Sequence, residues 1–147
     1  MADIVIRPMV EEDIPAILGI ERSSFSTPWS EISFLSEVYK KNAFSNVALF
    51  EENVIGYICV NYLLHESHIL NLAVHERFRR RGVATILINE TLKELKKKGC
   101  VFMYLEVRAS NAGAKKFYEL FGFAVESIRK KYYANPDEDA LLMMGRI

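Results

Sequence analysis

The order in which helical and extended patterns follow one another limits the fold of this chain more than any other feature. Residues 82–98 form the clearest predicted helix, because Ile88, Leu92 and Leu95 fall on one face. The next run, residues 101–107, is mostly apolar, a pattern typical of a strand buried on both faces. Alternation of this kind predicts a sheet with helices packed on its faces.

The remaining segments complete the prediction. Alternating or branched and aromatic-rich runs predict strands, and apolar residues at helical spacing predict helices. The further strands are expected at residues 3–9, 44–50, 54–64, 68–74, 123–133 and 140–147, and the further helices at 11–24, from Ser30-Glu31 onward, and at 111–121. The sequence therefore predicts an α/β (α+β) fold, with a mixed sheet of about seven strands and four helices on its faces. No linker or repeat divides the chain, so residues 1–147 are expected to form a single domain.

The composition is that of an ordinary soluble domain without a charge surplus. Of 147 residues, 50% are hydrophobic and 26% are charged, with nineteen Lys and Arg against nineteen Asp and Glu. A pI near 6.8 argues against a protein that mainly binds DNA, RNA or an anionic membrane. Asp3 stands where a secretory signal would be basic, and Cys59 and Cys100 lie in apolar runs typical of reduced, buried thiols. We therefore expect a cytoplasmic protein, as a monomer or weak homodimer.

A basic turn joins the predicted strand 68–74 to the predicted helix 82–98. The first turn of a helix leaves backbone N–H groups unpaired, and a glycine allows an anion to approach them closely. Arg79, Arg80 and Arg81 precede Gly82 and would add mobile positive charge. The residues predict an anion site here, although a solvated basic corner is the other interpretation.

Glu106 is the second notable residue, because it lies in an otherwise apolar predicted strand. A carboxylate of raised pKa could take a proton from an amine. The alternatives are an ion pair with Arg108 on the same strand face, or a strand end that opens to solvent. His65 and His68 bracket Glu66, but such a pair is more often a set of surface histidines than a zinc site, so no metal is expected.

Two motifs connect these residues to a known family. The pattern Arg79-x-x-Gly82-x-Ala84 resembles the acyl-CoA pyrophosphate signature of the GCN5-related N-acetyltransferases (GNAT), usually written Gln/Arg-x-x-Gly-x-Gly/Ala. The segments LEVRASNAGAKKFYELFGF (105–123) and IRKKYY (128–133) are similar to the RimI-type ribosomal-protein-alanine acetyltransferases. The resemblance implies the GNAT fold over the whole chain, acetyl-CoA as cosubstrate, and the diphosphate of coenzyme A as the anion.

The resemblance also implies roles for individual residues. Glu106 would accept a proton from the amine and Tyr118 would give one to the departing thiolate, although Tyr118 could equally be aromatic core and Asn111 a helix cap. The cofactor would lie against Leu72, Ala73, Val74, Arg79, Arg80, Arg81, Gly82, Val83, Ala84 and Asn111. The acceptor peptide would lie against Phe25, Trp29, Tyr132 and Tyr133, whose alternative role is to anchor loops.

The acidity of amines favours one class of acceptor. At pH 7 an α-amine needs about 1 kcal/mol to lose its proton, whereas a lysine side chain needs about 5 kcal/mol. The resemblance implies direct attack in a ternary complex by the N-terminal alanine of small-subunit ribosomal protein eighteen. A lysine, another protein N-terminus or a small amine as acceptor, a non-catalytic acyl-CoA-binding module, and an RNA-binding domain are the alternatives.

Overall fold

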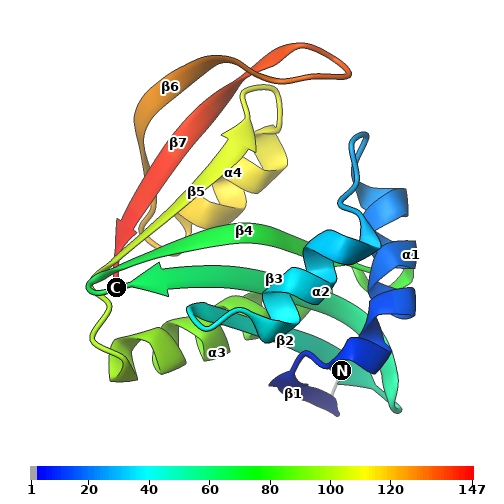
Figure 1. The fold of residues 1–147 in the computed structure, drawn as a ribbon. Coiled ribbons are helices and arrows are strands. Elements are labelled where there is room, and N and C mark those ends of the chain that lie inside the picture. Colours follow the sequence, from blue (N-terminus) through cyan, green and yellow to red (C-terminus); the bar gives the residue numbers. More distant parts are fainter. Residues whose placement is uncertain (1–2) are drawn as a thin grey trace.

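A seven-stranded mixed sheet forms the centre of the structure, a computed structural model that describes residues 3–147 (Figure 1). Its strands are β1 (Ile4–Pro8), β2 (Ala43–Phe50), β3 (Asn53–Leu63), β4 (Glu66–Val74), β5 (Phe102–Arg108), β6 (Ala124–Tyr133) and β7 (Glu138–Arg146). Its helices are α1 (Ile14–Ser24), α2 (Glu31–Tyr39), α3 (Val83–Lys97) and α4 (Ala112–Glu119), with short 3-10 turns η1 (Glu11–Asp13) and η2 (Glu76–Phe78). The predicted fold class, seven strands and four helices, is confirmed; the turn η2 was not predicted.

The strands follow the order β1-β2-β3-β4-β5-β7-β6, and every neighbouring pair is antiparallel except β4 and β5. These two central strands pair only where Glu66–His68 faces Phe102–Tyr104. Within the described residues, β4 beyond His68 has no partner on β5, and Figure 1 shows the two strands diverging. The sheet therefore opens into a V at its centre.

The helices cover both faces of the sheet. In Figure 1, α1 and α2 lie in front of the sheet and α3 and α4 behind it. Each face has its own hydrophobic core: Phe34 of α2 packs with Ile17 of α1 in front, and Leu87 of α3 packs with Met103 of β5 behind. Cys59 and Cys100 are free and buried, as predicted.

The predicted burial of β5 on both faces is wrong. Met103, Leu105 and Val107 are buried, whereas the alternating residues of the strand, including Glu106 and Arg108, are only partly covered. The reason is the separation of β4 from β5, together with the lack of a helix over the front of β5 (Figure 1). One face of this strand is therefore open to a ligand. None of the helices in residues 3–147 has the length and apolar character needed to span a bilayer.

Candidate active site

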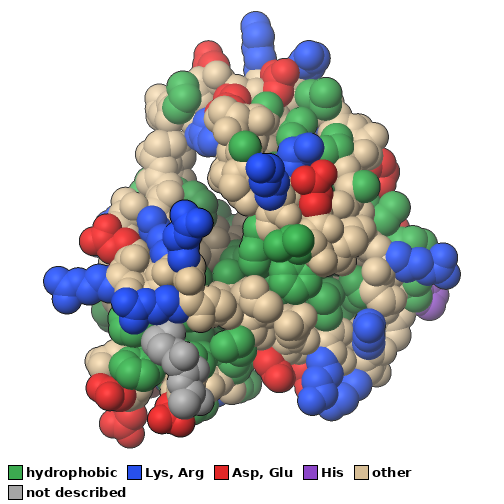
Figure 2. Space-filling model, turned by 180° about the vertical axis from the view of Figure 1, so that it is seen from behind, with side chains coloured by type: hydrophobic (Ala, Val, Ile, Leu, Met, Phe, Trp, Pro, Cys, Tyr) green, Lys and Arg blue, Asp and Glu red, His purple; other side chains and the backbone are tan. Residues whose placement is uncertain are grey.

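A cleft of about 730 Å³ opens where β4 and β5 separate. Its walls come from both strands, from the α1–α2 loop (residues 25–30), from the start of α4 and from the end of β6. From behind, the molecule is visibly hollowed between the part with α4 and the part with α3 (Figure 2). The predicted site residues that line the cleft are Phe25, Trp29, Leu72, Glu106, Asn111, Tyr118, Tyr132 and Tyr133. The fold thus gathers residues from four separate segments of the sequence.

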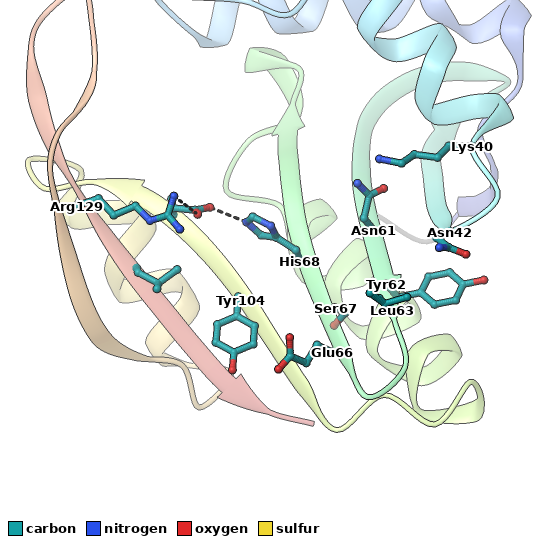
Figure 3. Close-up of a pocket in the computed structure, with 12 residues that line it drawn as sticks. Lys40, Asn42, Asn61, Tyr62, Leu63, Glu66, Ser67, His68, Tyr104 and Arg129 are labelled. Carbon is teal, nitrogen blue, oxygen red and sulfur yellow. Dashed lines mark hydrogen bonds and ion pairs between the residues drawn. The ribbon is translucent and has the colours of Figure 1, made fainter.

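Glu106 holds its carboxylate between two basic side chains. Its Oε2 lies 2.6 Å from His68 Nε2, and its Oε1 lies 3.9 Å from an Arg129 guanidinium nitrogen. Figure 3 shows the His68 and Arg129 side chains pointing toward this carboxylate across a second pocket that also contains Tyr104 and Glu66. Because the ionised carboxylate can only accept, we assign the shared hydrogen to His68 Nε2.

These contacts correct three expectations. The hydrogen bond from His68 lowers the pKa of Glu106 below its ordinary value, although burial acts in the opposite direction, so the expected raised pKa is wrong. The suggested pairing of Glu106 with Arg108 is also wrong, because Arg108 pairs with Glu138. His68, expected to be an ordinary surface histidine, is the hydrogen-bond partner of Glu106.

Tyr118, on α4, lines the cleft. The residue is 8% exposed, and its ring packs edge-on against Phe117 and Phe123. Its hydroxyl makes no hydrogen bond to any residue within 3–147, although the residue lines the cleft. Burial raises the pKa of Tyr118 well above that of a free phenol, so the group stays protonated at neutral pH. The ring belongs to the core while the hydroxyl is available to a ligand.

The cleft mouth is the opening between the α1–α2 loop and the segment 132–134. Trp29 is half-buried against Phe34, with ring centroids 5.1 Å apart, so it anchors its loop as well as lining the cleft. Tyr132 is half exposed, and its ring stands edge-on to Tyr133 at 5.1 Å. Aromatic faces at both sides of the opening suit an extended peptide.

The buried carboxylate of Glu21 on α1 holds the α1–α2 loop in place. Glu21 is 1% exposed; its Oε2 accepts the Trp29 backbone N–H at 2.9 Å, and its Oε1 accepts from Asn71 Nδ2 at 2.6 Å and from the Tyr57 hydroxyl. Three donors compensate the cost of burying the charge. The sequence offered one signal for this role of Glu21: a carboxylate on the apolar face of a predicted helix.

The basic turn before α3 has the features of an anion site. Gly82 is in the left-handed region at φ 85°, no side chain caps the helix there, and a Cβ at Gly82 would meet no atom within 4 Å. The first intrahelical bond runs from the Ile86 N–H to Gly82 O, so the N–H groups before it have no partner within the described residues. Arg80 and Arg81 are exposed, but Arg79 is not the mobile charge we expected: its Nε donates to Val74 O at 2.9 Å and its guanidinium reaches Ser24 Oγ at 3.0 Å.

The remaining predicted residues divide into two groups. Asn111 caps α4, since its side chain accepts the Ala114 N–H at 3.0 Å, and it also lines the cleft. Ala73, Val74 and Val83 have buried side chains and could offer a ligand only their backbone. None of these three lines the cleft, and neither do Arg79–Gly82 or Ala84. All of these positions follow Leu72, the last residue of β4 that lines the cleft.

The geometry suits a long ligand with an anionic end. The unpaired edge of β4 from Ile69 to Val74 offers backbone donors and acceptors to an extended arm, and it leads to the uncapped start of α3. Glu106 and Tyr118 lie across the cleft from that edge. These features fit coenzyme A, with its diphosphate at Gly82 and its thioester between the two side chains. Within residues 3–147, no cluster of three metal-ligating side chains occurs.

Comparison with known proteins gives consistent matches. The sequence profile of the Acetyltransferase (GNAT) family matches residues 14–123. A [ribosomal protein bS18]-alanine N-acetyltransferase of Salmonella typhimurium is 36% identical over 134 residues, covering 89% of each chain. An N-alpha-acetyltransferase of Saccharolobus solfataricus is 30% identical and covers 96% of this chain and 92% of its own. The crystal structure of the ribosomal-protein-S18-alanine N-acetyltransferase from Escherichia coli superposes with a TM-score of 0.92 at 31% identity, covering 99% of this chain and 94% of that one.

Proposed function

Because this chain belongs to the GNAT family of acetyltransferases, we propose that it transfers the acetyl group of acetyl-CoA to the N-terminal alanine of ribosomal protein bS18. The observation that carries the choice of acceptor is the 36% identity, over 89% of the chain, to an enzyme named for that substrate. The relative named simply as an N-alpha-acetyltransferase supports the broader assignment to protein N-termini. The cleft mouth, with aromatic side chains on both sides, is suited to a peptide backbone that enters with its first residue foremost.

In this reaction, bound acetyl-CoA supplies an acyl group activated as a thioester. The Gly82 turn and the N-terminus of α3 would hold the diphosphate, and the free edge of β4 would hold the arm that carries the thioester. Held in this way, the reacting carbonyl carbon would lie near Glu106, and Tyr132 and Tyr133, which line the same cleft, would orient the acceptor.

The proton must first leave the acceptor ammonium. An α-ammonium has a pKa of about 7.7–8.0, whereas a carboxyl group at its ordinary value lies near 4.3, so transfer to an isolated carboxylate costs about 5 kcal/mol. His68 lowers the pKa of Glu106 further, which makes a lone carboxylate a weaker base still. We therefore assign different parts of this step to the two side chains: His68, by its Nε2 hydrogen bond, keeps the Glu106 carboxylate ionised, and Glu106 binds the ammonium by its charge and passes its proton to water in the pocket of Figure 3.

The second proton goes to the leaving group. Once the amine nitrogen has bonded to the carbonyl carbon, it still carries one proton more than the amide product. As the carbon–sulfur bond breaks, the sulfur would take a proton from the Tyr118 hydroxyl, and Tyr118 would regain one from that nitrogen. A thiol has an ordinary pKa near 8.5, below that of a phenol, and burial raises the pKa of Tyr118 further. A free thiolate is therefore a weaker base than the Tyr118 phenolate, so transfer to sulfur is favourable only because Tyr118 regains a proton from the acidic nitrogen of the intermediate. Transfer is then concerted with bond breaking.

The test is a competition between two peptides. The first begins with the N-terminal residues of bS18 and has a free α-amine, and the second has the same sequence with a blocked N-terminus and an added internal lysine. With purified protein and acetyl-CoA, mass spectrometry is expected to show one acetyl group on the first peptide and none on the second. Acetylation of the lysine peptide first would contradict the proposal, and release of no thiol with either peptide would remove the activity.

A further inference from the structure

Arg108 lies at the end of β5, two residues beyond Glu106 and on the same face of the strand. It has a half-buried side chain, 23% exposed, which faces the hairpin turn between β6 and β7 (residues 134–137). Its guanidinium donates to the backbone carbonyls of Ala134 and Pro136, each at 2.9 Å, and lies 3.4 Å from Glu138 Oε1. A single side chain therefore binds the hairpin turn at two points and the first residue of β7 at a third.

The same guanidinium also reaches the opposite wall of the cleft mouth. It donates to Ser26 Oγ at 3.3 Å, in the α1–α2 loop. The hairpin turn and this loop come from opposite ends of the sequence, and Figure 1 shows them facing each other beyond the end of β5. Arg108 is thus a bridge across the rim of the opening through which an acceptor would enter.

Arg108 further positions Tyr133. Its guanidinium carbon lies 4.5 Å from the centroid of the Tyr133 ring, within the range of a cation–π contact. Tyr133 lines the cleft, and both burial and the nearby charge of Glu106 raise its pKa, to about 12. The ring is therefore held close to the carboxylate at which the acceptor amine would be bound.

Few other contacts hold the hairpin turn. Residues 134–137 are all exposed, and the pairing of β6 with β7 is irregular between Arg129 and Tyr133. Glu138 connects the turn to the start of α4, since its Oε2 accepts the Ser110 N–H at 2.6 Å. Because the turn buries little apolar surface, its position depends mainly on hydrogen bonds to charged groups, of which Arg108 supplies most.

We propose that Arg108 is a positioning residue that joins the two walls of the cleft mouth and, by fixing Tyr133 and the hairpin turn, sets the affinity for the acceptor peptide. The proposal rests on the proposed function, in that the acceptor enters through this mouth. A lysine cannot replace Arg108, because it is a point charge without the planar fork that reaches several acceptors at once.

The test compares Arg108→Lys with wild type and with Arg146→Lys as control. Arg146 also lies over an aromatic ring, with its guanidinium carbon 5.9 Å from the centroid of Phe102, but it lines neither pocket. For Arg108→Lys, we expect the KM for the peptide to rise about tenfold or more, as the loss of one or two charged hydrogen bonds would produce. The kcat and the Kd for acetyl-CoA are expected to stay within about threefold of wild type, and Arg146→Lys is expected to behave as wild type.

A second readout does not depend on activity. Hydrogen exchange of the amides in residues 133–138 and of those around Ser26 is expected to become faster in Arg108→Lys and to stay unchanged in Arg146→Lys. If wild type acetylates no N-terminal peptide, the proposed function fails, whereas faster exchange still supports the bridge. An unchanged peptide KM in an active enzyme, unchanged exchange, or equal loss of peptide and acetyl-CoA affinity would overturn the inference. Should Arg108→Lys not fold, Ser26→Ala removes one contact of the guanidinium and Glu138→Gln removes the charge of another, and each is expected to raise the peptide KM about two- to fivefold.

Discussion

Replacing Tyr118 by phenylalanine separates its two interpretations, aromatic core and proton donor. The substitution keeps the ring, and with it the edge-on contacts to Phe117 and Phe123 at centroid distances of 5.2 and 5.8 Å. It removes only a hydroxyl that makes no hydrogen bond to residues 3–147 and that borders the cleft. The free energy of unfolding is therefore expected to change by less than about 0.5 kcal/mol.

The effect on the reaction is expected to be much larger. General acid catalysis by a positioned side chain typically contributes about 10²- to 10⁴-fold in rate, or roughly 3–5 kcal/mol of activation free energy. If Tyr118 protonates the leaving sulfur, Tyr118→Phe should lower kcat by at least that lower factor and leave the Kd for acetyl-CoA little changed. If Tyr118 serves only as core, both stability and kcat should stay near wild type.

A matched control is available in Tyr57, a second buried tyrosine with a raised pKa. Its hydroxyl donates to the buried carboxylate of Glu21, so Tyr57→Phe removes a hydrogen bond to a charge and is expected to cost about 1–3 kcal/mol of stability. Tyr57 does not line the cleft. The two Tyr→Phe variants should therefore show opposite patterns, one in rate and one in stability.

The assay follows free thiol released from acetyl-CoA in the presence of a peptide that begins with alanine, alongside thermal melting of each variant. A Tyr118→Phe protein with wild-type kcat would refute the assignment of the proton donor. So would a loss of rate that is matched by an equal loss of stability, because that pattern belongs to a disturbed core.

Two further predictions test the proton acceptor and the anion site. His68→Ala removes the main cause of the lowered pKa of Glu106, so the pKa of Glu106 should rise. Because the Glu106 carboxylate must be ionised to act, the acid limb of the pH profile of kcat/KM should move to higher pH. An unmoved limb would contradict the pairing of Glu106 with His68. Gly82→Ala and Gly99→Ala each place a side chain at positive φ, at opposite ends of α3, and each should cost about 1 kcal/mol of stability. Calorimetric titration should show weaker binding of acetyl-CoA only for Gly82→Ala, and an equal effect in both would contradict the anion site.

Much of the fold follows from local pattern. The periodicity of residues 82–98 and the glycine after them fix α3 within one residue at each end, because its apolar stripe is continuous and its C-terminal stop is specific. β4 begins two residues before the predicted start, since Glu66 and Ser67 pair with β3 despite their polarity. Strand pairing depends on partners elsewhere in the chain, which alternation within one segment cannot reveal.

The site was predicted less completely than the fold. Motif resemblance identified Glu106 and Tyr118, which do line the same cleft, but not the state of the carboxylate. His68 is thirty-eight residues away in sequence and becomes a hydrogen-bond partner only because β4 and β5 pair in parallel at His68 and Tyr104. Arg79 likewise looked mobile because its partners, Val74 O and Ser24 Oγ, are brought to it by the fold. Contacts of this kind depend on register, which the sequence pattern does not specify.

A crystal structure of the protein with acetyl-CoA is the most direct test of where the reaction takes place. We expect the diphosphate against the N–H groups that follow Gly82, and the thioester in the gap between β4 and β5, with Glu106 on one side of it and Tyr118 on the other. Density for the thioester in the pocket beside Tyr104 and Glu66, or for the diphosphate away from α3, would contradict this expectation.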